Sequence, residues 1–571
     1  MPSDEAAATK SYAHRGGAVP LLGATIPERF AAMAGRWRGR EAVVSVPQGR
    51  RLSYGELAEA TDRLACALLA AGFGKGERIG VWSTNNLEWL LLQMASARIG
   101  AVLVNINPAY RERELAYALQ RSEVQGLFVI PGFHGSDYVA MLADLLPALR
   151  EPLSDRLDSA EFPFLRRVVL YDPRQPLETA RPLPGFSLWQ ELLALADAVP
   201  RSRLEEIGAG LDIDDPINIQ YTSGTTGFPK AVVLTHHNIL NNAYFSALAM
   251  GFSEADRLCI PVPFYHCFGM VLANLLCLSV GACAVIPCEH FDALAVLRAI
   301  QDERCTALHG VPTMFIAQLE HPRFKEFDLS SLRTGIMAGA PCPPPLLKRV
   351  MERMHCGGIL IGYGETEAAP LTHLTALDDS PERRTETVGT NLPHQEVKIV
   401  RLADGRTAAR GEVGEICFRG YHVMQGYYGD PEATKKAVDE NGWLRSGDLG
   451  TMDADGYVRI TGRLKEMIIR GGENIYPREI EEVLFAHPQV SQAAVFGVPD
   501  DFYGEQVMAW LQLRPGAAAT EAEIRAYCRE QLAHFKVPHY IWFVEEFPMT
   551  VTGKLQKFRM REMALKKLKP G

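Results

Sequence analysis

The sequence predicts an α/β protein with a large N-terminal domain of two α/β lobes plus a small β-rich subdomain, followed by a small mobile α+β C-terminal domain. Three observations support this expectation. Helix and strand patterns alternate in two separate stretches, short strands with glycine-rich turns follow, and a compact helix–strand unit ends the chain. The length of 571 residues also favours several domains.

The first alternating stretch runs from about residue 53 to residue 129. "LSYGELAEATDRLACALLAAGF" and "NLEWLLLQMASARIGA" have apolar residues at helical spacing, whereas "GERIGVWST" and "AVLVNINP" are short apolar strands. This order predicts a parallel sheet covered by helices.

The same rhythm returns from about residue 256 to residue 364, where "RLCIPVPF", "GACAVIP", "CTALHGVP" and "RTGIMAG" resemble strands. The sequence therefore predicts a second α/β lobe. Residues 131–198 lie between the two lobes and have a more irregular pattern, which we interpret as an insertion.

After about residue 380, "EVKIV", "GEICFRG" and "GYVRITGR" predict a small β-rich subdomain. The patterns that follow predict helix, strand, strand, helix and strand, a compact unit of the size of a separate domain. We expect a large domain over 1–462, a hinge at 463–465 and a small domain over 466–571.

Composition excludes several classes of protein. With 47% hydrophobic and 22% charged residues, the chain is neither disordered nor a coiled coil. A net charge of −9 argues against nucleic acid as a partner. The eleven cysteines include no C-x-x-C pair and predict reduced thiols.

The sequence also shows no pattern typical of a targeting signal. Residues 1–29 lack the apolar core of a secretory signal. Residues 267–287 are uncharged, but their pattern favours a buried helix and strand over a transmembrane segment. We expect a cytoplasmic protein.

The strongest local signal is the segment from Tyr221 to Lys230, "YTSGTTGFPK". Its glycines allow backbone N–H groups to approach a phosphate, its hydroxyls add donors, and its lysine adds positive charge. The spacing is not that of a Walker A loop, and the following "AVVL" predicts a strand, so no helix N-terminus supports the loop. The alternative interpretation is a solvated Ser/Thr/Gly turn.

This string resembles the signature of the acyl-adenylate-forming superfamily, the AMP-binding enzymes, which includes acyl- and aryl-CoA synthetases, luciferases and nonribosomal adenylation domains. Further motifs follow in that family's order: "GAP" at 339–341, "YGETE" at 363–367, "WLRSGD" at 443–448, "GRLKEMIIRGGENIYPREIE" at 462–481 and "PMTVTGKLQK" at 548–557. The resemblance covers nearly the whole chain, from about residue 52 to residue 566.

The resemblance implies a nucleotide site with ATP and Mg²⁺. The residues expected to hold the β- and γ-phosphates are Thr222, Ser223, Gly224, Thr225, Thr226, Gly227, Phe228, Pro229 and Lys230. The adenine side is implied to comprise Gly339, Ala340, Pro341, Tyr363 and Gly364, with Tyr363 stacked on the base.

Four further residues acquire implied roles around the α-phosphate and the ribose. Thr366 contacts the α-phosphate, Glu367 coordinates Mg²⁺, Asp448 accepts both ribose hydroxyls and Arg463 contacts the ribose or phosphate. Glu365 is a second carboxylate beside Glu367, and we favour Glu367 as the metal ligand.

The second half of the expected reaction involves the hinge and the C-terminal domain. By the same resemblance, Lys465 is the hinge residue, and Gly471, Gly472 and Glu473 form the loop on the coenzyme A side. Lys554 is the lysine that bridges the substrate carboxylate and the α-phosphate. His266 matches a gating position between the acyl and pantetheine tunnels, with a packed core histidine as the alternative.

The chemistry implied is ATP-dependent activation of a carboxylic acid to acyl-AMP and then acyl-CoA. Because the acid is already ionised at neutral pH, the site needs charge compensation rather than a strong base. The sequence ends soon after Lys554, so we expect free coenzyme A as the acceptor, with a separate carrier protein as the alternative.

The segments "GGENIYPREIEEVLFAHP" and "TVTGKLQKFRMRE" are most similar to those of medium-chain fatty acyl-CoA synthetases. The expected acyl tunnel is apolar and contains Tyr265, Phe268, Met270, Met314, Phe315 and Met337. Branched, aryl and thioether acids remain alternatives. A non-catalytic acyl- or nucleotide-binding relative is the alternative from another class. The sequence leaves the oligomeric state open, with a homodimer as one option.

Overall fold

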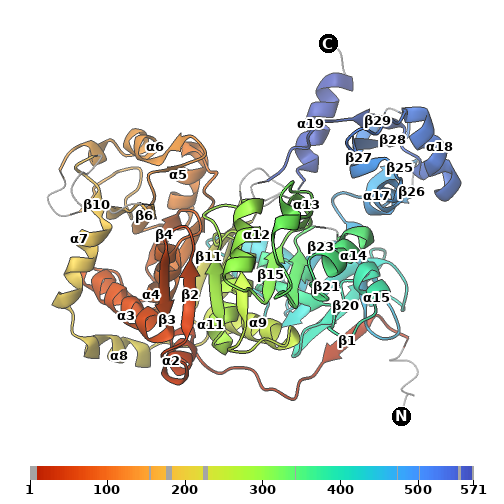
Figure 1. The fold of residues 1–571 in the computed structure, drawn as a ribbon. Coiled ribbons are helices and arrows are strands. Elements are labelled where there is room, and N and C mark those ends of the chain that lie inside the picture. The colour runs from red at the N-terminus through yellow and green to blue at the C-terminus, as the bar shows by residue number, and fades with distance from the viewer. Residues whose placement is uncertain are drawn as a thin grey trace.

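Two large sheets form the centre of the N-terminal part of the chain (Figure 1). The structure is a computed structural model that describes residues 9–152, 156–174, 183–222, 229–340, 342–471, 473–500, 502–550 and 555–568. The α/β fold class predicted from the sequence is confirmed.

The first sheet has eight strands in the order β10-β9-β6-β4-β5-β11-β12-β22. Pairing is parallel from β10 to β11 and antiparallel for β12 and β22. The strands are β4 (Arg78–Trp82), β5 (Val102–Ile106), β6 (Gly126–Val129), β9 (Arg167–Leu170), β10 (Ser187–Leu188), β11 (Pro216–Thr222), β12 (Lys230–Thr235) and β22 (Gly426–Tyr427).

The second sheet has nine strands in the order β19-β18-β17-β16-β15-β13-β14-β2-β3. Its interior strands are parallel, and an antiparallel pair closes each edge. The strands are β2 (Glu41–Ser45), β3 (Arg50–Ser53), β13 (Arg257–Cys259), β14 (Cys283–Ile286), β15 (Ala307–Gly310), β16 (Thr334–Ala338), β17 (Gly358–Gly364), β18 (Leu371–Leu374) and β19 (Thr390–Asn391).

Helices cover the faces of the two sheets, as their parallel strands require. Helix α9 contacts β12 of the first sheet and β18 of the second. Helix α4 is apolar on all sides and buried along Leu87–Ala97, the pattern of an internal helix. The main helices are α2 (Ile26–Arg36), α3 (Tyr54–Ala70), α4 (Leu87–Arg98), α5 (Glu112–Arg121), α9 (His236–Ala249), α12 (Ala293–Asp302), α13 (Pro312–Leu319) and α14 (Pro344–Arg353).

The interpretation of residues 131–198 as an irregular insertion was wrong in one respect, because β9 and β10 extend the first sheet from this segment. Their runs of four and two residues carry too little periodic pattern to reveal a strand. Residues 267–287 form the predicted buried helix and strand, with a π-helical turn at Met270–Leu275. Over the described ranges, no helix has the length and apolar character needed to cross a membrane.

A third sheet is antiparallel and has the order β1-β20-β21-β23-β24. Its strands are β1 (Tyr12–Arg15), β20 (Gln395–Val400), β21 (Gly414–Gly420), β23 (Leu444–Met452) and β24 (Val458–Arg463). This sheet is the predicted β-rich subdomain, and β1 adds an N-terminal strand that the sequence did not predict.

The C-terminal elements, blue in Figure 1, follow the predicted order of helix, strand, strand, helix and strand. They are α17 (Pro477–Ala486), β27 (Val490–Asp500), β28 (Gly504–Leu513), α18 (Glu521–Gln531) and β29 (Tyr540–Phe543), preceded by β25 (Ile468–Arg470) and β26 (Glu473–Ile475) and followed by α19 (Lys557–Leu568). Helix α17 packs against β24 of the third sheet.

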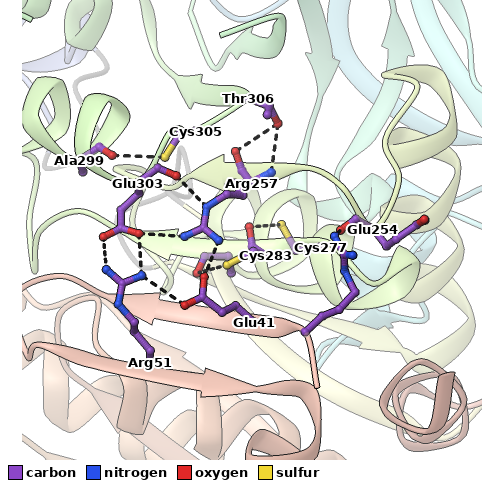
Figure 2. A network of polar contacts seen from close by, with 12 residues as sticks. Glu41, Arg51, Glu254, Arg257, Cys277, Cys283, Ala299, Glu303, Cys305 and Thr306 are labelled. Atoms are coloured by element: carbon purple, nitrogen blue, oxygen red, sulfur yellow. Dashed lines mark hydrogen bonds and ion pairs between the residues drawn. The ribbon is translucent and has the colours of Figure 1, made fainter. Parts of the chain in front are cut away.

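Within the second sheet, a network of ion pairs joins the β2–β3 hairpin to β13 and to Glu303, the residue after α12 (Figure 2). Arg257 on β13 pairs with Glu41 at 2.6 Å and with Glu303 at 2.8 Å. Arg51 on β3 also pairs with both carboxylates. Because only 9% of the Glu303 side chain is exposed, removing its arginine partners would leave a poorly hydrated charge.

We therefore expect Arg257→Leu to lower the free energy of unfolding by about 2–3 kcal/mol, since Glu303 and Glu41 then keep only Arg51 of the two arginines, and 22% of the Arg257 side chain is exposed. Thermal unfolding followed by calorimetry would measure the loss. Arg38→Leu is the matched control, because its pair with Glu59 is solvent-exposed and should contribute little. Equal losses in the two variants would contradict a special role for the network.

Candidate active site

The phosphate-loop sequence connects two antiparallel strands, β11 and β12. Thr222 and Lys230 lie opposite each other at the ends of these strands. Ser223, Gly224, Thr225, Thr226, Gly227 and Phe228 lie outside the described residues. The Tyr117 hydroxyl of α5 donates to the Pro229 carbonyl at 3.0 Å, which fixes one flank of the loop. The strand β12 follows the loop, as predicted from the sequence.

Glu367 contacts the phosphate-loop strands directly. It lies in a short 3₁₀ turn, Thr366–Ala368. Its Oε1 atom accepts hydrogen bonds from Thr222 Oγ1 at 3.3 Å and from the Tyr427 hydroxyl at 2.9 Å. Lys230 Nζ lies 4.4 Å from the centre of the Tyr427 ring. The fold therefore brings together two residues predicted to hold phosphate and the residue predicted to hold Mg²⁺.

The donor set around Glu367 suits a magnesium ion bound mainly through nucleotide phosphates. One carboxylate with lone pairs still available, beside phosphate oxygens, is the usual protein contribution to such a site. Glu365 is a weaker ligand, because burial and the neighbouring charges of Glu367 and Asp448 raise its pKa well above the usual value. Glu365 Oε1 has no hydrogen-bond partner within the described part of the chain. These features favour Glu367, as predicted from the sequence.

The predicted adenine and ribose residues meet at Asp448 on β23. Arg463 lies opposite on β24, and its Nε is 2.9 Å from Asp448 Oδ1. The Tyr363 hydroxyl, at the end of β17, donates to Asp448 Oδ2 at 2.7 Å. Burial and then Asp448 raise the pKa of Tyr363 well above its usual value, so this phenol stays protonated. Two sheets thus contribute to one polar cluster.

The backbone around Tyr363 requires small residues. A Cβ atom on Gly364 would lie 1.9 Å from the Pro370 carbonyl oxygen, so only glycine fits there. Gly339, at the end of β16, has a φ of +85°, which also favours glycine. The carbonyl of the next residue, Ala340, accepts a hydrogen bond from the Cys342 thiol. Pro341 lies outside the described residues.

His266 lies in the segment that precedes α11 (Leu276–Val280), and its neighbour Cys267 contacts Thr366 of the 3₁₀ turn Thr366–Ala368. Thr366 Oγ1 lies 3.5 Å from Cys267 Sγ. His266 Nδ1 accepts the Phe268 N–H at 3.1 Å and so caps the helical turn Cys267–Gly269. This contact gives His266 a structural role, and its gating role stays a prediction.

The apolar residues predicted for the acyl tunnel divide between two hydrophobic clusters. Phe268, Met270 and Met314 belong to the large central cluster, whereas Phe315 and Met337 are fully buried in the cluster beneath β15 and β16. Tyr265 is half-buried. Phe268 and Met270 also contact His266 through their backbone N–H groups, so these two residues are the better candidates for contact with an acid.

The predicted hinge follows β24 as a tight turn. The Arg463 carbonyl accepts the N–H groups of Glu466 and Met467, both at 3.0 Å, and Lys465 is exposed in the turn. Gly471 has a φ of +59° and donates its N–H to the Tyr503 carbonyl at 2.8 Å. Glu473 is exposed at the start of β26. Gly472 and Lys554 lie outside the described residues.

A lysine that sequence analysis did not single out links this turn to α19. Lys557 Nζ lies 2.9 Å from both Glu466 and Glu481. Burial alone would lower the pKa of Lys557, but the two carboxylates raise it overall, so the ammonium persists. The segment after Lys554 is therefore attached to the residue that follows the predicted hinge.

Tyr427 is the site residue that sequence analysis missed. It lies outside every motif singled out above, in "MQGYYGDPEAT", and its position beside Glu367 depends on the pairing of β22 with β12. A local pattern carries no signal for such a contact.

Comparisons with known proteins identify the family of this chain. The model of the AMP-binding enzyme family matches residues 30–428, and that of the AMP-binding enzyme C-terminal domain matches residues 479–554. YngI of Bacillus subtilis, provisionally named an acyl-CoA synthetase, is 47% identical over 95% of this chain and 98% of its own length. The mitochondrial medium-chain acyl-CoA ligase ACSF2 of Danio rerio is 40% identical over 98% of this chain and 91% of its own.

Solved structures agree as well. ATP-bound MatB from Rhodopseudomonas palustris superposes with a TM-score of 0.80 at 28% identity, covering 95% of this chain and all of that one. The anthranilate CoA ligase AuaEII in complex with anthranoyl-AMP gives 0.80 at 25% identity, covering 96% and 98% of the two chains. The match of the family model over most of the chain, together with these relatives, shows that the chain belongs to the AMP-binding enzyme family, as the sequence motifs predicted.

Proposed function

We propose that this protein is an AMP-forming acid–thiol ligase that uses ATP to convert a carboxylic acid to acyl-AMP and then to acyl-CoA, releasing pyrophosphate and AMP. The observation that carries the proposal is the grouping of Thr222, Lys230 and Glu367 in one cluster beside Tyr363, Asp448 and Arg463 in another. The first cluster suits phosphates and the second suits a nucleoside. Relatives named as acyl-CoA synthetases and ligases support the same enzyme class.

Adenylation joins two anions, so the main task of the site is to compensate negative charge. Lys230 would contribute at the outer phosphates, and Arg463 would contribute near the ribose and α-phosphate. Bound through Glu367, Mg²⁺ would polarise phosphate oxygens. Asp448 would accept the ribose hydroxyls and hold the α-phosphorus at a fixed distance from the acid.

The second step needs a thiol, for which we propose free coenzyme A. Lys554 would serve adenylation, and the loop Gly471–Glu473 would serve thioester formation, with 463–465 as the hinge between 1–462 and 466–571. Since one small domain carries both Lys554 and this loop, rotation at the hinge would change which of the two faces the site. A separate carrier protein is the alternative acceptor, and a cytoplasmic location completes the proposal.

For the acid we propose a medium-chain fatty acid. The ACSF2 relatives are named for medium-chain acyl groups, and Phe268 and Met270 are buried apolar residues that contact His266. Acid-dependent AMP formation, measured with and without coenzyme A, tests both the function and the acceptor. AMP formation that does not depend on added acid would contradict the proposal.

The acid specificity should follow chain length. Each additional buried methylene contributes about 0.8 kcal/mol, so kcat/KM should rise about three- to fourfold per carbon up to a medium-chain optimum and then fall. A panel of straight-chain acids in a pyrophosphate-release assay measures this trend. A preference for acetate or benzoate over octanoate would reject the medium-chain proposal and leave the enzyme class unchanged.

Lys554→Ala should lower the rate of acyl-AMP formation about 100- to 1,000-fold, because a preorganised cation is lost where charge develops. The same variant should convert preformed acyl-AMP and coenzyme A to thioester at a nearly normal rate. Lys566→Ala on the exposed face of α19 is the matched control and should affect neither step. Normal adenylation by Lys554→Ala would show that the role of this lysine is misassigned.

A further inference from the structure

Tyr427 is held rigidly beside the phosphate-loop strands. It lies opposite Val232 in the antiparallel pair of β22 with β12, and its own N–H donates to Thr434 Oγ1 at 2.9 Å. Only 9% of the residue is exposed. Backbone pairing and burial therefore leave the ring little freedom to move.

The Tyr427 hydroxyl determines which oxygen of Glu367 remains available. It donates to Oε1 at 2.9 Å, and Thr222 donates to the same atom at 3.3 Å. The Met424 N–H, three residues before Tyr427, donates to the Glu367 backbone carbonyl at 2.8 Å. With Oε1 occupied twice, Oε2 is the freer oxygen for a metal ion.

Lys230 lies over the ring face of Tyr427, with its Nζ 4.4 Å from the ring centre. An ammonium over a tyrosine ring is attracted by the negative face of the π system. Across the described segments, no ion pair joins Lys230 to Glu367, although both contact Tyr427. Opposite charges this near would otherwise attract each other and neutralise the groups that an incoming nucleotide and its metal require.

We propose that Tyr427 is a positioning residue that holds Lys230 and Glu367 apart, its hydroxyl orienting the carboxylate proposed to bind magnesium and its ring supporting the lysine proposed to bind phosphate. This inference rests on the proposed function, because it assumes that the site receives ATP with Mg²⁺. The hydroxyl and the ring of Tyr427 have different roles in this proposal, so two substitutions can test them one at a time.

Tyr427→Phe removes the hydroxyl and keeps the ring, whereas Tyr427→Leu removes both. Tyr428→Phe is the matched control, since the Tyr428 hydroxyl also donates to a carboxylate, Glu123, at 2.8 Å, on the other side of the strand pair. ATP binding is measured by calorimetry without acid, first in EDTA and then across a magnesium titration. Thermal unfolding confirms that each variant is folded.

We expect Tyr427→Phe to raise the magnesium concentration for half-maximal enhancement of ATP binding about tenfold, as loss of an outer-shell partner typically does, with ATP affinity in EDTA within twofold of wild type. Tyr427→Leu should raise this magnesium concentration similarly and should also weaken ATP binding in EDTA about three- to tenfold. Tyr428→Phe should change neither quantity.

An unchanged magnesium dependence in Tyr427→Phe, or an equal change in Tyr428→Phe, would overturn the inference. Equal ATP affinity of Tyr427→Leu and Tyr427→Phe in EDTA would overturn the role of the ring. Failure of the wild-type protein to bind ATP would instead overturn the proposed function, so the two failures are distinguishable.

Discussion

The nucleotide site depends on the shared carboxylate of Asp448. Its two oxygens hold Tyr363, from the second large sheet, and Arg463, the last residue of the third sheet. Since only 5% of Asp448 is exposed, these contacts form where water competes weakly and charge interactions are strong. One residue thereby fixes the distance between Tyr363, which is proposed to bind the base, and the start of the predicted hinge.

The C-terminal part is attached to this centre through a second charged cluster. Lys557 pairs with Glu466 just after the hinge and with Glu481 of α17. Burying one ammonium between two carboxylates stabilises it strongly, and loss of either carboxylate would leave a buried charge less compensated. A rotation at residues 463–465 would therefore carry Glu466, α17 and α19 together, and the strain of the motion would fall on the short turn.

Local patterns account for what could be predicted from the sequence. The α3 capping box of Ser53 and Glu56 and the order of the C-terminal elements follow from neighbours in the chain. The pairing of β1 with β20 joins residues almost four hundred positions apart, and the β2–β3 hairpin completes a sheet whose other strands begin some two hundred residues later. No periodicity encodes such contacts.

The site shows the same difference between what local motifs predict and what contacts between distant segments create. Resemblance identified Lys230, Glu367, Asp448 and Arg463, and the fold places them in two adjoining clusters. Tyr427 and Lys557 were missed, because each acts through partners on other elements. Their roles become visible only once the sheets have formed.

Glu365 shows how burial also adjusts the charge of the site. Glu367, Asp448 and Glu365 together would place three negative charges where an anionic nucleotide must bind. Burial, Glu367 and Asp448 raise the pKa of Glu365 well above its usual value, which disfavours its charged form. In the proposed reaction the other two carboxylates each have a partner, a metal ion for Glu367 and Arg463 with the ribose for Asp448. Lys230 and the loop donors would then be left to oppose the phosphates, which is the charge distribution that the proposed adenylation requires.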